Sequence, residues 1–150
     1  MSNKAIEKAE EIIKSKAGVA GGEGVALSLL DHEGYPTTSA ISISKANGIQ
    51  QITFAVSLDS NKAKRAKANN RACVCIFDDN FEGGSYYNIT LVGDIDVVTD
   101  IEVKKETWYQ GLEEYFPNGF DDPNYCVLKL TTKRYNLWVD IEEEETTGSF

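Results

Sequence analysis

The sequence contains few cysteines and lacks any long apolar run, and each shortage excludes a class of protein. Cys73, Cys75 and Cys126 are too few and odd in number for a disulfide scaffold, so we expect reduced thiols in a cytoplasmic protein. No apolar run approaches the roughly 20 residues that a transmembrane helix needs. The polar start of the chain also has no signal-like core, so we expect no membrane association.

Basic residues are outnumbered by acidic ones, 15 to 24, which gives a formal net charge of −9. Phosphate contacts supply most non-specific affinity for nucleic acids, so this charge argues against a nucleic-acid partner and against anionic membrane surfaces. A chain of 150 residues is most simply one domain. We assign residues 1–141 to that domain, including an amphipathic helix over 3–16, and expect residues 142–150 to form an acidic disordered tail.

Residues that commonly carry catalysis are sparse as well. His32 is the only histidine and lies in a predicted turn, where solvent exposure is its ordinary state. Cys73 and Cys75 would share one face of a strand, but no second cysteine pair accompanies them, so no metal site is expected. The glycine fingerprint of dinucleotide folds is absent, and the GGEG segment lacks the Lys-Ser/Thr ending of a P-loop. No side chain is assigned as an acid, base or nucleophile.

The chain does contain a series of short strands joined mostly by tight turns. Alternating apolar and polar residues predict strands at 25–30, 36–45, 49–57, 72–77, 86–98, 125–132 and 134–141. Helices are expected at 3–16, at about 61–70 and at 100–114. Gly93 inside a strand indicates a bulge or a close approach of two backbones. These elements favour a mainly β, antiparallel barrel with flanking helices over a parallel βαβ sheet.

The segment Gln51–Asn70 stands out because it combines a strand with the start of a basic helix. Ser60 has the position of an N-cap, and cations follow it at positions 62, 64, 65 and 67. Surface lysines are usually only solvated. A cation in the first helical turn, however, is not favoured by the helix dipole, and the unpaired N–H groups there suit a phosphate. We therefore interpret this corner as an anion site.

Several motifs in order resemble the pyridoxamine-phosphate-oxidase-like, FMN-binding split barrels, particularly their short general-stress-protein branch. They are Gly34-Tyr35-Pro36, residues 54–62 (FAVSLDSNK), 67–74 (KANNRACV) and 88–96 (NITLVGDID), Trp108, residues 116–119 (FPNG), Asp122-Pro123 and Trp138. The likeness covers most of residues 25–140. It implies a split barrel of about six to seven strands and a homodimer with FMN at the subunit interface.

The resemblance also implies roles for the residues of the basic corner. Ser60 and Lys62 would bind the FMN phosphate together with the helix N-terminus, whose first turn includes Asn61. Val56 and Ser57 would present backbone and hydroxyl groups to the flavin. An apolar residue at Val56, where relatives usually have threonine, removes one such contact.

Residues farther along the chain complete the implied site. Asn88 matches an amide that contacts the isoalloxazine ring, and Trp138 and Trp108 would contribute from the second subunit. Many relatives carry an arginine toward the cofactor where this chain has Ser39. The C-terminal arginine and histidine motif of the true pyridoxamine-phosphate oxidases is absent, which argues against vitamin B6 oxidation.

The function expected from the resemblance is that of an FMN-binding flavoprotein that performs or senses redox chemistry in connection with stress. Two alternatives stay open. One is a non-enzymatic module that binds flavin or haem, and the other is a stress protein whose cofactor site has decayed. The substrate, the electron donor and the occurrence of catalysis are not specified by the sequence.

Overall fold

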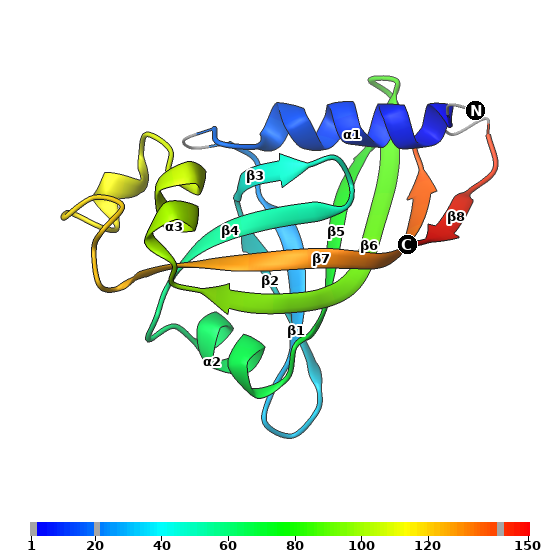
Figure 1. The fold of residues 1–150 in the computed structure, drawn as a ribbon. Coiled ribbons are helices and arrows are strands. Elements are labelled where there is room, and N and C mark those ends of the chain that lie inside the picture. Colours follow the sequence, from blue (N-terminus) through cyan, green and yellow to red (C-terminus); the bar gives the residue numbers. More distant parts are fainter. Residues whose placement is uncertain (1–2, 20–21, 141–142) are drawn as a thin grey trace.

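A single antiparallel sheet of eight strands organises the described residues, which are 3–19, 22–140 and 143–150 of a computed structural model (Figure 1). The helices are α1 (Lys4–Lys16), α2 (Asn61–Ala68) and α3 (Ile101–Thr107), with a 3-10 turn η1 (Leu112–Glu114). The strands are β1 (Val25–Leu30), β2 (Pro36–Ile41), β3 (Ile43–Asn47), β4 (Gln51–Ser57), β5 (Arg71–Asn80), β6 (Ser85–Val98), β7 (Tyr125–Trp138) and β8 (Thr146–Ser149).

The strand order explains why the sheet curls into a split barrel. The order is β2-β1-β5-β6-β7-β4-β3, and β8 pairs with β7 outside this path. The two ends of the order, β2 and β3, are separated in the chain only by Ser42, so the sheet must bend for the chain to pass between them. The predicted antiparallel split barrel is therefore confirmed, with eight strands rather than six or seven.

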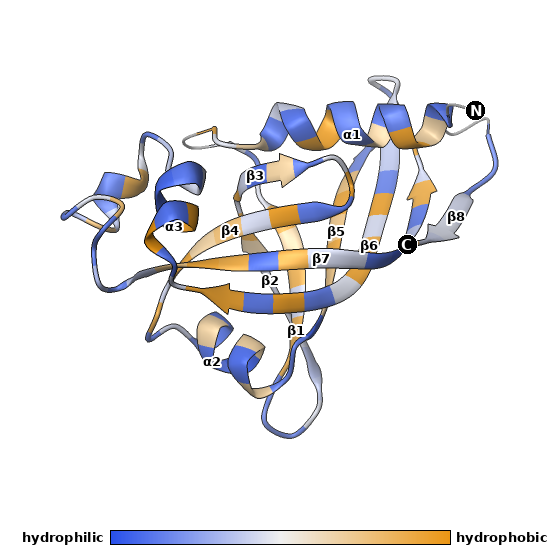
Figure 2. Cartoon of the chain, viewed as in Figure 1, coloured by the Kyte–Doolittle hydropathy of each residue, from blue (hydrophilic) through white to orange (hydrophobic). Residues whose placement is uncertain are grey.

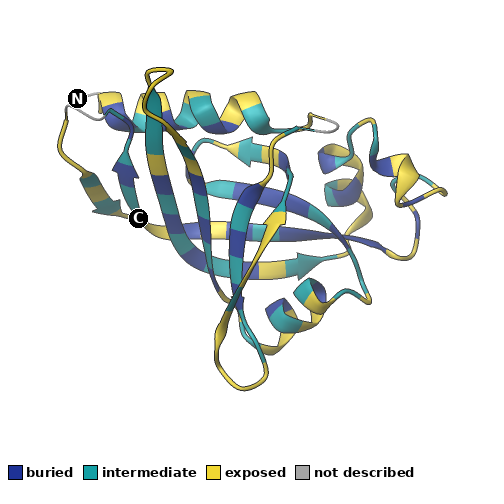
Figure 3. Ribbon diagram, turned by 180° about the vertical axis from the view of Figure 1, so that it is seen from behind, coloured by how far each residue is buried: buried dark blue, intermediate teal, exposed yellow. Residues whose placement is uncertain are grey.

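The interior of the barrel is filled by alternate side chains of the strands. Val74, Ile76, Ile89 and Leu91 are fully buried on the inner faces of β5 and β6, as strand periodicity requires. Apolar residues accordingly line the strands in Figure 2, and buried positions follow the same strands in Figure 3. Helix α1 covers one opening, with Ile13 fully buried against the core. Its N-cap Asn3 accepts the N–H of Ala5 at 3.0 Å.

Gly93 allows the two longest strands to approach closely. A Cβ atom at this position would lie 2.8 Å from the carbonyl carbon of Thr131 and 3.0 Å from the Cα of Thr132. The pairing of β6 with β7 also shifts here, because Val92 faces Arg134 while Gly93 faces Thr132. Lys133 is therefore the extra residue of a bulge. Both the bulge and the close approach agree with the prediction made for Gly93.

Several predicted elements have different bounds in the structure. Residues 36–45 form two strands, because the chain turns at Ser42 from β2 to β3. The helix expected over 100–114 ends at Thr107, where the chain turns to pack Trp108 against Tyr125. The two strands expected at 125–132 and 134–141 are one strand, β7, in which Lys133 forms the bulge.

The expectation of a disordered tail over 142–150 is wrong for its last residues. Residues 146–149 form β8, which pairs with residues 134–137 of β7. The physical reason is that this part of β7 would otherwise have an unpaired edge, which β8 covers. Phe150 adds a ring contact with Tyr135, with centroids 5.5 Å apart. Residue 142 lies outside the described residues.

Candidate functional site

The corner between β4 and α2 has the geometry of a helix N-terminus open to a ligand. The N–H of Ser60 donates to the carbonyl of Ser57 at 3.0 Å, which closes the turn. The Ser60 hydroxyl accepts the N–H of Ala63 at 3.1 Å, so Ser60 is the N-cap of α2. The first turn of α2 contains no acidic residue. Its remaining N–H groups and partial positive charge are therefore free of a built-in anion.

A cleft of about 300 Å³ opens beside this corner. Ser57, Ser60 and Lys62 supply hydroxyl groups and one cation at one end. The other side is largely apolar and aromatic. The residues that line the cleft are Ile41, Ser42, Ala55, Val56, Ser57, Ser60, Lys62, Tyr109, Leu112, Tyr115 and Phe116. A site that joins a cationic hydroxyl-rich end to an apolar wall suits a ligand with an anionic group and a flat ring.

The aromatic wall comes from the segment after α3 and is supported from behind. Phe116 is only 3% exposed, and its ring centroid lies 5.0 Å from that of Tyr125. Trp108 packs on Tyr125 at 5.3 Å in a T-shaped arrangement. Tyr115 is 74% exposed, so it can move against a ligand without losing core contacts. Burial raises the pKa of Tyr109, which keeps this phenol neutral near neutral pH.

Polar contacts fix the loop that carries this wall to the rest of the barrel. The buried Lys104 donates from Nζ to the carbonyl oxygen of Asp122 at 3.0 Å. The Asp122 carboxylate accepts the N–H of Asn124 at 2.9 Å and that of Asn118 at 3.3 Å. The backbone carbonyl of Asn124 in turn accepts the N–H of Leu58 at 2.8 Å. The loop and the β4–α2 corner are thus held as one unit.

Four of the predicted site residues meet at this cleft, and two others lie near it. Val56, Ser57, Ser60 and Lys62 line the cleft. Asn61, the first residue of α2, is exposed and does not line it. Trp108 lies behind the aromatic wall of its own chain, where it packs on Phe116 at 6.5 Å.

The other predicted residues lie elsewhere in the same chain. Asn88 pairs with Trp138 at the end of β7 remote from Tyr125, while Ser57 pairs with Tyr125 itself (Figure 1). The Trp138 indole N–H donates to the carbonyl of Glu143 at 3.1 Å. One subunit therefore does not bring Asn88 and Trp138 to the cleft at Lys62.

Ser39 is also outside the cleft. It is exposed in β2 and pairs with Leu27 of β1. The hydroxyl from this region that lines the cleft belongs to Ser42, at the turn between β2 and β3. Matching the sequence to the family motif position by position selects Ser39 and not Ser42, because the sequence does not show that the chain turns at Ser42.

The sequence-based interpretation missed most of the aromatic wall. The helix expected over 100–114 includes Tyr109 and Leu112 and ends beside Tyr115, and nothing in their spacing separates a cleft wall from a helix face. The available signal was the density of aromatic residues from Trp108 to Phe116 beside a glycine. Gly111 adopts φ 110°, which interrupts the helical pattern.

Acid–base and metal chemistry have little support at this site. Within residues 3–19, 22–140 and 143–150, no group of three or more metal-binding side chains occurs. Among the described residues that line the cleft, none is a carboxylate, a histidine or a cysteine. The arrangement of one cation, hydroxyl groups and aromatic rings suits an anionic aromatic ligand, and redox chemistry at such a site would come from the ligand.

This split barrel with a cleft at a helix N-terminus defines a known class of protein. The family model described as "Pyridoxamine 5'-phosphate oxidase like" matches residues 22–148. The chain belongs to this family, in agreement with the resemblance found in its motifs. No curated protein matches the sequence. None of the described helices is long and apolar enough to cross a membrane.

Solved structures show the same fold. A protein from Clostridium acetobutylicum, related to general stress protein 26 of B. subtilis, is 25% identical with a TM-score of 0.80, covering 100% of this chain and 97% of that one. General stress protein 26 from Bacillus anthracis str. Sterne is 17% identical with a TM-score of 0.69, covering 91% and 96%. A heme binding protein from Mycobacterium smegmatis is 16% identical with a TM-score of 0.75, covering 99% of this chain and 59% of that one.

Proposed function

We propose that this protein is a cytoplasmic, homodimeric flavoprotein that binds FMN with its phosphate at the cleft beside α2. The observation that supports this most is the pairing of Ser60 and Lys62 at a helix N-terminus with an aromatic wall across the same cleft. FMN carries a phosphate and a flat ring, which match these two parts. When bound, the flavin would supply the capacity to accept and donate electrons.

The phosphate would be held by the side chains and backbone of the corner. The ammonium group of Lys62 and the free N–H groups of the first turn of α2 supply positive charge. The Ser60 oxygen already accepts the Ala63 N–H, which leaves its proton free to donate to a phosphate oxygen. Ser57 offers a second hydroxyl. These groups replace the arginine that relatives place where this chain has the exposed Ser39.

The size of the cleft supports a shared site. About 300 Å³ is at the low end for pockets that enclose a small molecule, so one chain would hold only part of FMN. Asn88 and Trp138 lie at the opposite end of β7 from the corner. If both contact the flavin, as the family resemblance implies, they must come from the second subunit of a closed two-fold dimer.

FMN binding by wild type and variants tests the proposal. The purified protein should show flavin absorbance with about one FMN per subunit. Replacing Lys62 with Ala removes a charge-assisted hydrogen bond of about 1.5–3 kcal/mol and should weaken FMN binding about 10- to 150-fold. Riboflavin lacks the phosphate, so its affinity should change little. Lys64→Ala, which removes the same charge from an exposed position outside the cleft, is the control.

Mixed dimers test whether the site is shared. A heterodimer of one Lys62→Ala subunit and one Trp138→Ala subunit would contain one intact site and one doubly impaired site. It should bind about half an equivalent of FMN tightly, although each homodimer binds weakly. A protein that ignores FMN, or a Lys62→Ala variant with unchanged preference for FMN over riboflavin, would refute the assignment. If FMN does bind, turnover of NAD(P)H with a dye as electron acceptor distinguishes an oxidoreductase, which turns over, from a flavin carrier, which does not.

A further inference from the structure

A second hollow of about 490 Å³ lies on the outer face of the sheet, across β1, β5, β6 and β7. It shares no lining residue with the cleft at Lys62. One row of paired residues forms its floor. Ser28 faces Cys73, Cys73 faces Val92, and Val92 faces Arg134. Leu30 and Pro36 add apolar surface at one side. We call this hollow the arginine cleft.

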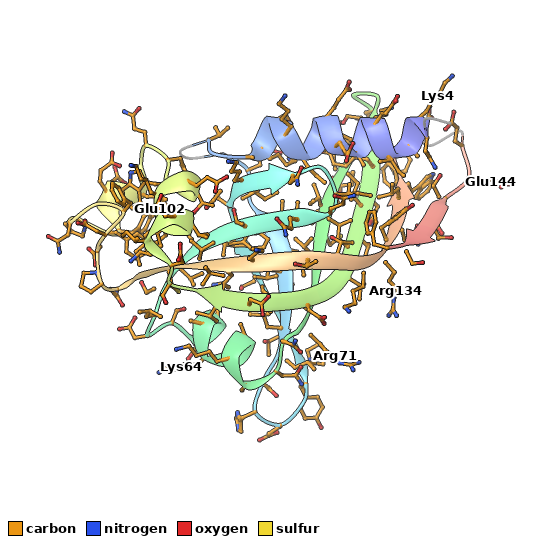
Figure 4. All side chains as sticks on the ribbon, viewed as in Figure 1. Lys4, Lys64, Arg71, Glu102, Arg134 and Glu144 are labelled. Carbon is orange, nitrogen blue, oxygen red and sulfur yellow. The ribbon has the colours of Figure 1, made fainter. Side chains whose placement is uncertain are left out.

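Two arginines from strands on either side of β6 flank the arginine cleft. Arg71 of β5 faces Asp94, and Arg134 of β7 faces Val92, two residues away along β6. Neighbouring strands are about 4.8 Å apart and each residue rises about 3.4 Å along a strand, so the backbones of these arginines lie about 12 Å apart on the sheet. Figure 4 shows both side chains extending on the same side of the molecule. Their guanidinium groups can therefore approach one ligand from two sides.

The two arginines have no charged partner in the part of the chain that the structure describes. Among the described residues, neither guanidinium group, that of Arg71 or that of Arg134, forms an ion pair or a hydrogen bond. Asp94 faces Arg71, but its carboxylate contacts Lys133 at 3.3 Å instead. Two unpaired guanidinium groups at one hollow are notable in a chain with a net charge of −9, which offers many carboxylates.

The positive charge of Arg134 acts on Cys73, which lies on the floor of the cleft. Burial raises the pKa of the Cys73 thiol, and the positive charge of Arg134 partly opposes that rise. Arg134 is therefore close enough to the Cys73 thiol for its charge to oppose the effect of burial. Ser28 lies beside the thiol, and its hydroxyl is 2.7 Å from that of Thr38.

We propose that the arginine cleft is a second ligand site, which binds a small phosphate monoester through Arg71 and Arg134. A phosphate monoester carries close to two negative charges at neutral pH, one for each unpaired arginine. Guanidinium groups bind phosphate oxygens in a bidentate manner, which gives geometric selectivity as well as attraction. The organic part of the ligand would lie on Leu30, Pro36 and Val92. The volume of the hollow suits a ligand of this size.

Calorimetric titration with phenyl phosphate tests this site apart from the cleft at Lys62. The Lys62→Ala variant serves as the background, so that phosphate binding at the cleft beside α2 contributes little to the titration. In that background, Arg71→Gln and Arg134→Gln should each weaken phenyl phosphate binding about 10-fold or more. Lys64→Gln removes the same charge from α2, outside the arginine cleft, and should leave the affinity within about twofold (Figure 4). Phenol, which has no phosphate, should not bind.

Alkylation of Cys73 gives a second readout. In a Cys75→Ser variant, phenyl phosphate should slow the reaction of Cys73 with iodoacetamide, because the ligand covers the floor and neutralises Arg134. The proposal is overturned if phenyl phosphate does not bind at millimolar concentration. It is also overturned if the arginine variants bind as tightly as the Lys64 control, or if the ligand leaves the alkylation rate unchanged. None of these results depends on whether FMN binds.

Discussion

The close approach at Gly93 makes a specific prediction for Gly93→Ala. The added Cβ would meet only backbone atoms, namely the carbonyl group of Thr131 and the Cα of Thr132, the latter at 3.0 Å. Backbone cannot turn aside as a flexible side chain can, so β6 and β7 must separate locally. These two strands pair over 88–98 and 127–138, and the strain would fall at their bulge.

The expected size of the effect follows from two opposing contributions. Overpacking at a rigid site costs about 1–3 kcal/mol. Replacing glycine with alanine also restricts the unfolded chain, which recovers about 0.4–1 kcal/mol. We therefore expect Gly93→Ala to lower the free energy of unfolding by about 1–2 kcal/mol. For a protein of this size, each kcal/mol corresponds to about 2–4 °C in Tm.

Urea denaturation at one fixed protein concentration measures this effect, because self-association would change the apparent stability. Gly24→Ala is the matched control. Its added Cβ would make ordinary contacts of 3.5 Å with Ala40 and with the carbonyl oxygen of Ile41, so its stability should be unchanged or slightly higher. If Gly93→Ala unfolds at the same urea concentration as Gly24→Ala, the close approach of β6 and β7 does not constrain this position.

Two further predictions concern a buried thiol and the C-terminal strand. Burial raises the pKa of Cys126 to about 11, so between about pH 9 and 11 the unfolded chain loses a proton that the folded chain keeps, and stability falls as pH rises. Between pH 8 and pH 10.5 the urea midpoint should fall less in Cys126→Ala than in wild type. An equal fall in both proteins would contradict this prediction. Deleting residues 146–150 should leave the edge of residues 134–137 that faces away from β6 without a partner strand and increase self-association in light scattering. An unchanged monodisperse sample would show that β8 does not protect this edge.

The fold was predictable where local patterns and turn chemistry agree. The strand over 25–30 and the N-cap at Ser60 appear where the sequence predicts them, because each depends on only a few neighbouring residues. Lys133 shows the limit. A polar residue between two apolar runs indicates a break, but the pairing with Gly93 converts it into a bulge inside one strand. That outcome depends on a partner strand some forty residues away, which local pattern does not include.

The candidate site divides in the same way. Ser57, Ser60 and Lys62 share one strand–turn–helix segment, and they meet at the cleft as a local motif would require. The aromatic wall could not be derived, because its geometry depends on contacts between Phe116 and Tyr125 and on the anchoring of its loop by Lys104. These contacts join segments that are separated in the sequence, and no local sequence pattern indicates that they meet.

Asn88 and Trp138 lie far from Lys62 within one chain, so any part that they play in ligand binding requires a second subunit. β7 pairs with β4 at one end and with the start of β6 at the other, so this topology keeps both residues away from Lys62 in any single chain. If a monomeric form binds FMN with full affinity, these two residues have no part in the site, although the phosphate assignment can still stand. If affinity instead rises with dimer formation, the long β7 strand explains why neither subunit can complete the site alone.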